Sequence, residues 1–401
     1  MKRLAFWAAW LPLTVGAGWG LTGCEKVDSK AEGHPDTEDV WTPATVPLDE
    51  LAGLFASLPL TTDQMQEVQD AVTASTENGY DEEYRLTDLF EEPGRGVGEE
   101  YLQTKSPTKS YALPLREMIA EQVRGQAPPT KGSLLNEMDP ESYLAALQDS
   151  DAQLYWPGAE NWDGKSLPII TFDPGDASEN NTGYRLTDDG VEVLTVSEAM
   201  AKKEPVWVLN RNDDAQYRTI DVLRKNDPDW GLGGSLGTKS EGDGAKKMLR
   251  LRTFRMLRQY DTWFRGASEF FVRAGAVEDF TASTEAEMKL YNPSLTDFVV
   301  VIRRGQVGMN MKVNTVLVSE WTDQLDRIGL MITEDDGGTR TNWKCTTIVK
   351  IHSKSYGIDL DIPYRTYDDI IWRGQLARSY LERYNGKACR FGGLDLTFEF
   401  D

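Results

Sequence analysis

The pattern of apolar and polar positions divides the chain after residue 47 into a helical part and a strand-rich part. Up to residue 149, apolar side chains such as Leu51, Leu54 and Leu58 recur at helical spacing. Thr61 and Gln64 stand where a capping box would start the second helix. Two further helices are predicted from a proline at the first turn and an apolar face: 114–125, and a short one from 139.

From Leu154 the period changes to the alternation of strands, interrupted by turn-forming Asp-Gly and Pro-Gly pairs. A small, mostly β unit is predicted, with strands at 154–156, 167–172, 191–196 and 206–210. The stretch 226–246 is rich in glycine and reads as a linker between this region and the rest of the chain.

The C-terminal part alternates between apolar and polar positions almost to its end, which is typical of an antiparallel β-sandwich. Its last strand shows the pattern most clearly, because Leu394, Leu396 and Phe398 alternate with polar residues. Residues 368–384 are the exception, and their apolar spacing predicts a helix. The other predicted strands are 248–257, 269–274, 297–303, 315–321, 328–333, 343–351 and 356–362.

These patterns predict an α+β fold class with an N-terminal helical layer, a small mixed unit and a C-terminal antiparallel sandwich. The expected organisation has five segments. They are a signal peptide (1–23), a flexible acidic tether (24–47), a helical and mixed β region (48–225), a Gly-rich linker (226–246) and the β-sandwich domain (247–401).

The first 24 residues have the charged start and the apolar run of an export signal. The segment ends in Leu21-Thr22-Gly23-Cys24, which resembles the lipobox of bacterial lipoproteins. In that family the cysteine thiol carries a diacylglyceryl group and the chain is cut before the cysteine. The resemblance implies that Cys24 is lipidated and holds the protein at a membrane. The alternative is one uncleaved membrane span.

The charge balance limits the partners of this chain. It has 401 residues, 65 Asp and Glu against 43 Lys and Arg, and a net charge of −22. The phosphates of nucleic acids repel so acidic a protein, so no nucleic-acid partner is expected. Only two histidines are present, too few for His-rich metal sites. The acid excess lies toward the N-terminus, whereas residues 247–401 are nearly balanced.

Two acidic loops of the C-terminal domain form a candidate calcium site. Calcium takes roughly six to eight oxygen ligands, several of them carboxylates. The strands and loops that carry these acids weakly resemble C2-type β-sandwiches, in which loops at one end share calcium ions. That family usually has Asp where Glu269 stands, and a longer aspartate series in the second loop. The alternative is solvated turn residues. The candidate ligands are Asp261, Glu269, Glu334, Asp335 and Asp336.

Cys345 and Cys389 follow an export signal and therefore face an oxidising compartment, where they could form a disulfide. Cys345 also shares the apolar face of its predicted strand, so a buried free thiol is the alternative. Neither cysteine has the spacing of a zinc or redox motif.

Aromatic and polar residues gather between Tyr155 and Gly164. Exposed Trp and Tyr rings can stack on sugar rings, while neighbouring amide and carboxylate groups bind hydroxyls. The alternative is that the rings fill the core. The candidate ligand-binding residues are Tyr155, Trp156, Asn161, Trp162 and Asp163.

Several stretches, among them 160–165, 205–213 and 334–340, resemble a group of envelope lipoproteins of the Bacteroidota for which no activity is established. The resemblance implies an envelope setting, with the outer membrane as the expected site. The leading hypothesis is a lipid-anchored, non-catalytic binding module, stabilised by calcium, whose partner is a glycan or an envelope protein. One alternative is a glycan hydrolase that uses carboxylates, and another is a purely structural envelope component.

Overall fold

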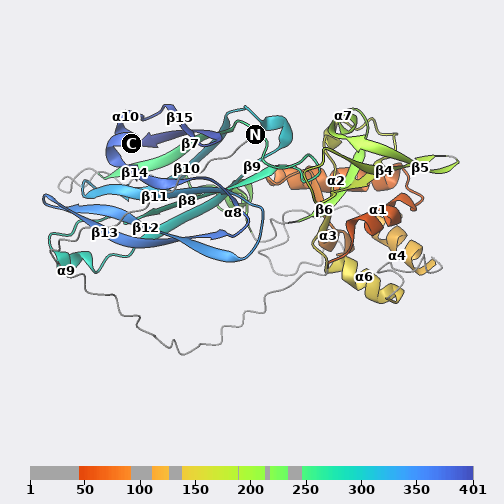
Figure 1. Cartoon of the computed structure of the whole chain (residues 1–401), viewed down its shortest axis with the longest axis horizontal. Helices are drawn as coiled ribbons and strands as arrows, with labels where there is room; N and C mark the ends of the chain where they lie inside the picture. The colour runs from red at the N-terminus through yellow and green to blue at the C-terminus, as the bar shows by residue number, and fades with distance from the viewer. Residues whose placement is uncertain are drawn as a thin grey trace, which may run out of the picture. The chain divides into compact units, whose positions relative to one another are not determined.

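The computed structural model describes residues 45–91, 111–125, 138–187, 189–212, 217–233 and 246–400 (Figure 1). The predicted signal peptide, Cys24 and the tether up to residue 44 lie outside these ranges. Val46, which the sequence assigns to the tether, is fully buried in the N-terminal core. The folded part therefore begins before residue 48. No helix within the described ranges is long and apolar enough to cross a membrane.

The predicted N-terminal helices form at the expected positions. Thr61 and Gln64 make the reciprocal capping box at the start of the second helix, and Asp139 accepts hydrogen bonds from the first backbone N–H groups of the helix at Pro140. These caps satisfy donors that a helix terminus leaves without a partner. The predicted helices are α1 (Leu48–Ala56), α2 (Thr62–Glu77), α4 (Leu115–Gly125) and α6 (Pro140–Gln148), and the structure adds the short α3 (Leu86–Phe90), which the sequence pattern did not predict.

These helices cover a mixed sheet with the strand order β1-β2-β6-β3-β4-β5. Strands β3 and β6 run parallel and the other neighbours are antiparallel. The buried face of the sheet packs against the helices in one core that contains Leu51, Phe55, Leu154 and Leu209. The strands are β1 (Glu83–Arg85), β2 (Ala152–Tyr155), β3 (Ile169–Phe172), β4 (Asn180–Thr187), β5 (Gly190–Ser197) and β6 (Val206–Arg211).

The C-terminal part contains two mainly antiparallel sheets that share one core. One sheet has the order β10-β7-β16-β15, and the other β13-β12-β11-β8-β9. Phe254 of the first sheet meets Phe270 of the second with ring centroids 5.1 Å apart. The strands are β7 (Lys247–Met256), β8 (Ser268–Ala276), β9 (Ser294–Ile302), β10 (Met311–Trp321), β11 (Leu325–Glu334), β12 (Arg340–Ile351), β13 (Lys354–Arg365), β15 (Ala388–Phe391) and β16 (Leu394–Phe400).

The prediction of a helix at residues 368–384 is wrong for most of these residues. Residues Asp369–Ala377 form strand β14, which pairs with β11 from Arg327 to Glu334, and only Arg378–Arg383 form a helix, α10. Backbone hydrogen bonding to a neighbouring strand outweighs the helical spacing of a few apolar side chains. The remaining helices are short: α7 (Glu198–Ala201), α8 (Ile220–Asn226) and α9 (Glu285–Met288).

The fold class is therefore α+β with C-terminal antiparallel sheets, as predicted. Residues 43–401 form a single compact unit, and the first part of the predicted linker contributes to it. Trp230 packs against the C-terminal core, edge to face with Phe298.

Both cysteines of the body are free thiols. Cys345 on β12 packs against Met331 and Ile362, whereas Cys389 on β15 belongs to the other sheet and packs against the sandwich core. The disulfide alternative is thus not formed in this structure, because the two cysteines lie in different sheets and pack in different clusters. Burial raises the pKa of the Cys345 thiol to about 11, which keeps it protonated and unreactive.

Candidate functional site

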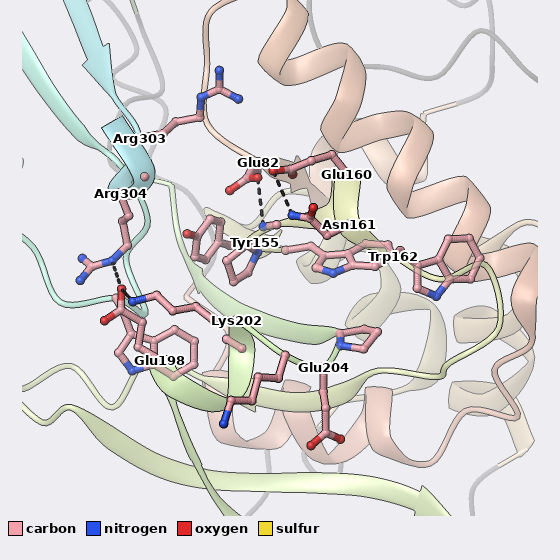
Figure 2. A pocket seen from close by; sticks show the side chains of 18 of the residues that line it. Glu82, Tyr155, Glu160, Asn161, Trp162, Glu198, Lys202, Glu204, Arg303 and Arg304 are labelled. Carbon is pink, nitrogen blue, oxygen red and sulfur yellow. Dashed lines mark hydrogen bonds and ion pairs between the residues drawn. The ribbon is translucent and has the colours of Figure 1, made fainter. Parts of the chain in front are cut away.

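A cavity of about 580 Å³ opens where β2 ends and where β3 and β6 begin (Figure 2). Its walls come from the η1 turn (Ala159–Asn161), from α7 and from the η2 turn (Arg304–Gln306), which follows β9. The N-terminal sheet and the C-terminal sandwich therefore both contribute to it. The volume is in the range of roughly 300–1,000 Å³ that small-molecule sites occupy.

All five residues predicted to bind a ligand line this cavity. They do not contribute equally, because Tyr155 and Trp156 are each only 1% exposed and belong to the hydrophobic core. The core interpretation therefore holds for these two rings. Asn161, Trp162 and Asp163 lie at the accessible part of the wall.

Trp162 is the accessible aromatic residue among these five. Its ring is half-buried and stands edge-to-face against Trp156, with centroids 5.9 Å apart. Its indole N–H donates to the Ser166 carbonyl at 2.9 Å. These two contacts hold the ring in one orientation before any ligand arrives, which lowers the entropic cost of binding on its surface.

The Asp163 carboxylate accepts hydrogen bonds within its own turn. It accepts hydrogen bonds from the backbone N–H groups of Lys165 and Ser166 and from the Ser166 hydroxyl. The bonds from Ser166 and Lys165 lower the pKa of Asp163 to about 2. Asp163 therefore stays ionised and shapes the loop, with its oxygens already engaged.

Two carboxyl groups meet on one wall. The Glu82 and Glu160 side chains hydrogen-bond to each other, and Glu82 Oε1 accepts the Gly158 N–H at 3.0 Å. Burial, the negative charge of Asp81 and the contact with Glu160 raise the pKa of Glu82 to about 8. At neutral pH Glu82 is thus mainly protonated, and its one O–H is used in the hydrogen bond with Glu160.

The opposite wall holds an ion cluster. Arg304 Nε lies 3.1 Å from Glu198 Oε1 and Lys202 Nζ lies 3.2 Å from the same oxygen (Figure 2). Burial alone would raise the pKa of Glu198, but Arg304 and Lys202 outweigh it and lower that pKa. The cavity thus presents a neutral carboxylic acid on one wall and an ionised carboxylate on the other, an arrangement that suits hydrogen bonding to hydroxyl groups.

Sequence reasoning missed Glu82, Glu198, Arg303 and Arg304. The first two stand among many other acids, and no motif distinguishes them. The adjacent arginines directly before Gly305 give no signal either, because the chain has other basic pairs, such as Arg224-Lys225 and Lys246-Lys247. Only the contact between the two parts of the fold brings these residues to one cavity.

Three of the five residues predicted to bind calcium come together. Carboxylate oxygens of Asp261, Glu334 and Asp336 lie within 4.8 Å of one another. Arg265 stands beside this cluster, 3.7 Å from Asp261 and 3.4 Å from Asp336. Burial and the charges of Asp261 and other acids nevertheless raise the pKa of Asp336 to about 6.

The other two predicted ligands are not in this cluster. Asp335 is buried, forms an ion pair with Arg365 at 3.3 Å and accepts the Gly337 N–H. Burial, partly offset by Arg365, raises the pKa of Asp335 to about 7. Glu269 lies on β8 opposite Val301, and its backbone carbonyl accepts the Asp335 N–H. The carboxylates of one acidic loop therefore point in different directions.

No protein-family model, curated protein or solved structure matches this chain. The resemblances to envelope lipoproteins and to C2-type sandwiches therefore remain predictions from the sequence, and the site must be interpreted from its own chemistry.

Proposed function

We propose that this protein is a saccharide-binding module held at the bacterial envelope by a lipid on Cys24. The observation that supports the proposal is the cavity. The oriented Trp162 ring lies in its wall together with amide and carboxyl groups that can hydrogen-bond to the hydroxyl groups of a sugar. Flat apolar sugar faces stack on aromatic rings, while the polar groups fix the orientation of the sugar.

A glycan array probed with residues 43–401 tests the binding. We expect a subset of glycans to bind, and Trp162→Ala to weaken that binding by at least about tenfold, the effect of losing a central aromatic contact. Tyr367→Ala is the matched control, because Tyr367 is 72% exposed and does not line the cavity. Absence of any bound glycan would contradict the proposal and favour a structural or protein-binding role.

Membrane attachment is tested separately with the full chain. We expect wild-type protein in the membrane fraction of a bacterial host, with labelled fatty acid attached, and Cys24→Ser in the soluble fraction without label. Several acyl chains give near-permanent attachment, since each buried CH₂ contributes about 0.8 kcal/mol. A Cys24→Ser protein that stays with the membrane would favour the uncleaved span.

A second candidate function, glycan hydrolysis, is favoured by the opposite environments of Glu82 and Glu198. A protonated carboxyl could donate its proton to the glycosidic oxygen as the C–O bond breaks, while an ionised one takes a proton from the attacking water. The ion pairs that hold Glu198 weaken it as a base, so binding without turnover remains the leading proposal.

Prolonged incubation with a bound glycan decides between the two functions. Release of shorter saccharides that Glu82→Gln abolishes, without loss of binding, would establish the hydrolase. Glu204→Gln is the control, since Glu204 is paired with Arg185 at 2.6 Å. Intact glycan after incubation with stoichiometric protein supports the binding module.

Calcium remains a prediction for the cluster of Asp261, Glu334 and Asp336. The proximity of three carboxylates supports it, whereas Arg265 already supplies a positive charge there. A bound ion would have to displace that guanidinium.

A further inference from the structure

The outer face of the four-stranded sheet β10-β7-β16-β15 carries excess positive charge, in a chain whose net charge is −22. Inward side chains of this sheet, such as Leu251 and Leu396, belong to the sandwich core. The side chains that alternate with them point away from that core. The five bases and two acids on this side form what we call the basic face: Arg250, Arg252, Arg255, Lys312, Arg390, Asp395 and Glu399. Five positive and two negative charges give it a net charge of +3.

One of the two acids of the basic face is shared between two arginines. Asp395 on β16 lies opposite Arg255 on β7 and opposite Arg390 on β15. Its carboxylate accepts a hydrogen bond from each guanidinium group, from Arg390 Nε at 2.6 Å. A single negative charge between two positive charges leaves one positive charge in excess.

The other acid is matched by one arginine, and two further bases have no acid at all. Arg252 Nε lies 2.8 Å from Glu399. Arg250 donates to the Leu232 carbonyl at 2.8 Å, a neutral acceptor that leaves its charge uncompensated. Neither Arg250 nor Lys312 forms an ion pair with any residue that the structure describes. These two bases supply the rest of the excess charge.

The basic face is open to solvent. The side chains of Arg252, Lys312 and Arg390 are exposed, and they lie on three different strands, β7, β10 and β15. The positive charge is therefore spread across the width of the sheet and is not gathered in a cavity. Such an arrangement matches an extended anionic surface better than a small anion.

Acids beside the sheet are matched by bases of their own. Where β7 begins, Glu382 lies 3.1 Å from Lys247 and Glu320 lies 3.4 Å from Lys246. The acid excess of the chain lies before residue 247. At physiological salt, interactions between exposed charges more than about 8 Å apart are largely screened. A partner at the basic face therefore meets mainly the local positive charge.

We propose that the basic face binds the anionic phospholipid headgroups of a membrane. The choice of a membrane rests on the attachment through Cys24 proposed above, which would keep such a surface close to the folded part at high effective concentration. Guanidinium groups suit phosphates, because they donate two parallel hydrogen bonds. Basic residues near an anionic leaflet add to the binding that a lipid anchor provides.

The test is sedimentation of residues 43–401, which lack Cys24, with lipid vesicles. We expect this protein to sediment with vesicles of phosphatidylcholine and phosphatidylglycerol, and to stay in solution with vesicles of phosphatidylcholine alone. Binding should weaken as the salt concentration rises, because salt screens the attraction.

The double variant Lys312→Gln, Arg390→Gln should lower the affinity for the anionic vesicles about fivefold for each charge removed. The matched control is Lys344→Gln, Lys354→Gln, which removes two exposed lysines from β12 and β13 and changes the net charge equally. The control should bind as wild-type protein does. Melting curves of both double variants report on folding.

Three results would overturn the inference. The first is failure to bind anionic vesicles, or equal binding to neutral ones. The second is an equal loss in both double variants, which would mean that net charge and not this face decides binding. The third is binding of a short DNA duplex, lost in Lys312→Gln, Arg390→Gln, by a protein that does not bind vesicles, since the partner would then be a nucleic acid.

These outcomes are separate from those of the proposed function. The vesicle assay contains neither the anchor nor a glycan, so its failure leaves lipidation and saccharide binding intact. In cell fractionation, high salt should release a Cys24→Ser protein that the basic face alone retains on the membrane. An uncleaved span would stay in the membrane after the same wash.

Discussion

At the scale of single residues, Gly266 shows how one position joins the two parts of the fold. It has a φ of +98°, and a Cβ at this position would collide with Asp81 Oδ2. That same oxygen accepts the Ala267 N–H at 2.8 Å, which links the start of β1 to the segment before β8. Glycine is therefore required both for the backbone conformation and for this approach.

Gly266→Ala should lower the free energy of unfolding by about 3 kcal/mol, because the left-handed conformation and the collision add together. Gly175→Ala is the matched control. Gly175 has a φ of +73° with nothing within 4 Å of the added Cβ, so it should lose only about 1 kcal/mol. Urea unfolding of both variants measures the difference, and equal losses would show that the contact with Asp81 is dispensable.

The carboxylates of Asp261, Glu334 and Asp336 make a second prediction at this scale. Calcium at millimolar concentration, added after a chelator, should raise the melting temperature by several degrees. A ligand at a hundred times its dissociation constant adds about 2.7 kcal/mol to the folded state. Asp336→Asn should abolish the response, whereas Asp359→Asn, an exposed residue of β13, should keep it. A wild-type melting temperature that calcium leaves unchanged would show that this cluster is not a calcium site.

At the scale of elements, local signals predict the helices well, because each terminus carries its own chemistry. Thr61 caps α2 and Asp139 caps α6 as their positions indicate. Strands β4 and β14 have no such signal. The side chains of β4 are mostly polar, and β14 has helix-like apolar spacing. Their conformation depends on backbone bonds to β3 and β5, or to β11, which local sequence does not reveal.

Thr61→Ala should therefore lower the free energy of unfolding by about 1 kcal/mol, because the Thr61 hydroxyl no longer accepts from the Asp63 N–H or donates to Gln64. Thr73→Ala, at an exposed interior position of the same helix, should be neutral or slightly stabilising, since alanine has the higher helix propensity. Chemical denaturation distinguishes the two. A loss at Thr73 as large as that at Thr61 would contradict the capping role.

At the scale of the whole molecule, buried carboxyl groups predict how stability depends on pH. Burial raises the pKa of Glu67 from 4.5 to about 7 and that of Glu82 to about 8. Below 4.5 both states hold these protons. As pH rises, the unfolded state ionises first, so stability falls between about 4.5 and 8 and levels off above.

The melting temperature should thus be higher near about pH 5 than near about pH 9, and the double variant Glu67→Gln, Glu82→Gln should make this dependence shallower, while Asp335 and Asp336 carry the remainder. The control is Glu121→Gln, which changes an exposed acid of α4. The same slope in the double variant and in wild-type protein would mean that these two groups do not carry the effect.

The sequence alone determined the α+β class, the helices with their caps, most strands of the sandwich and the aromatic segment at 155–164. Each of these has a local physical cause, either a periodicity or a capping residue. The tertiary structure decided the rest, because it depends on contacts between distant residues. It turned residues 369–377 into a strand, placed Tyr155 and Trp156 in the core, and brought Glu82, Glu198 and Arg304 to the wall of one cavity.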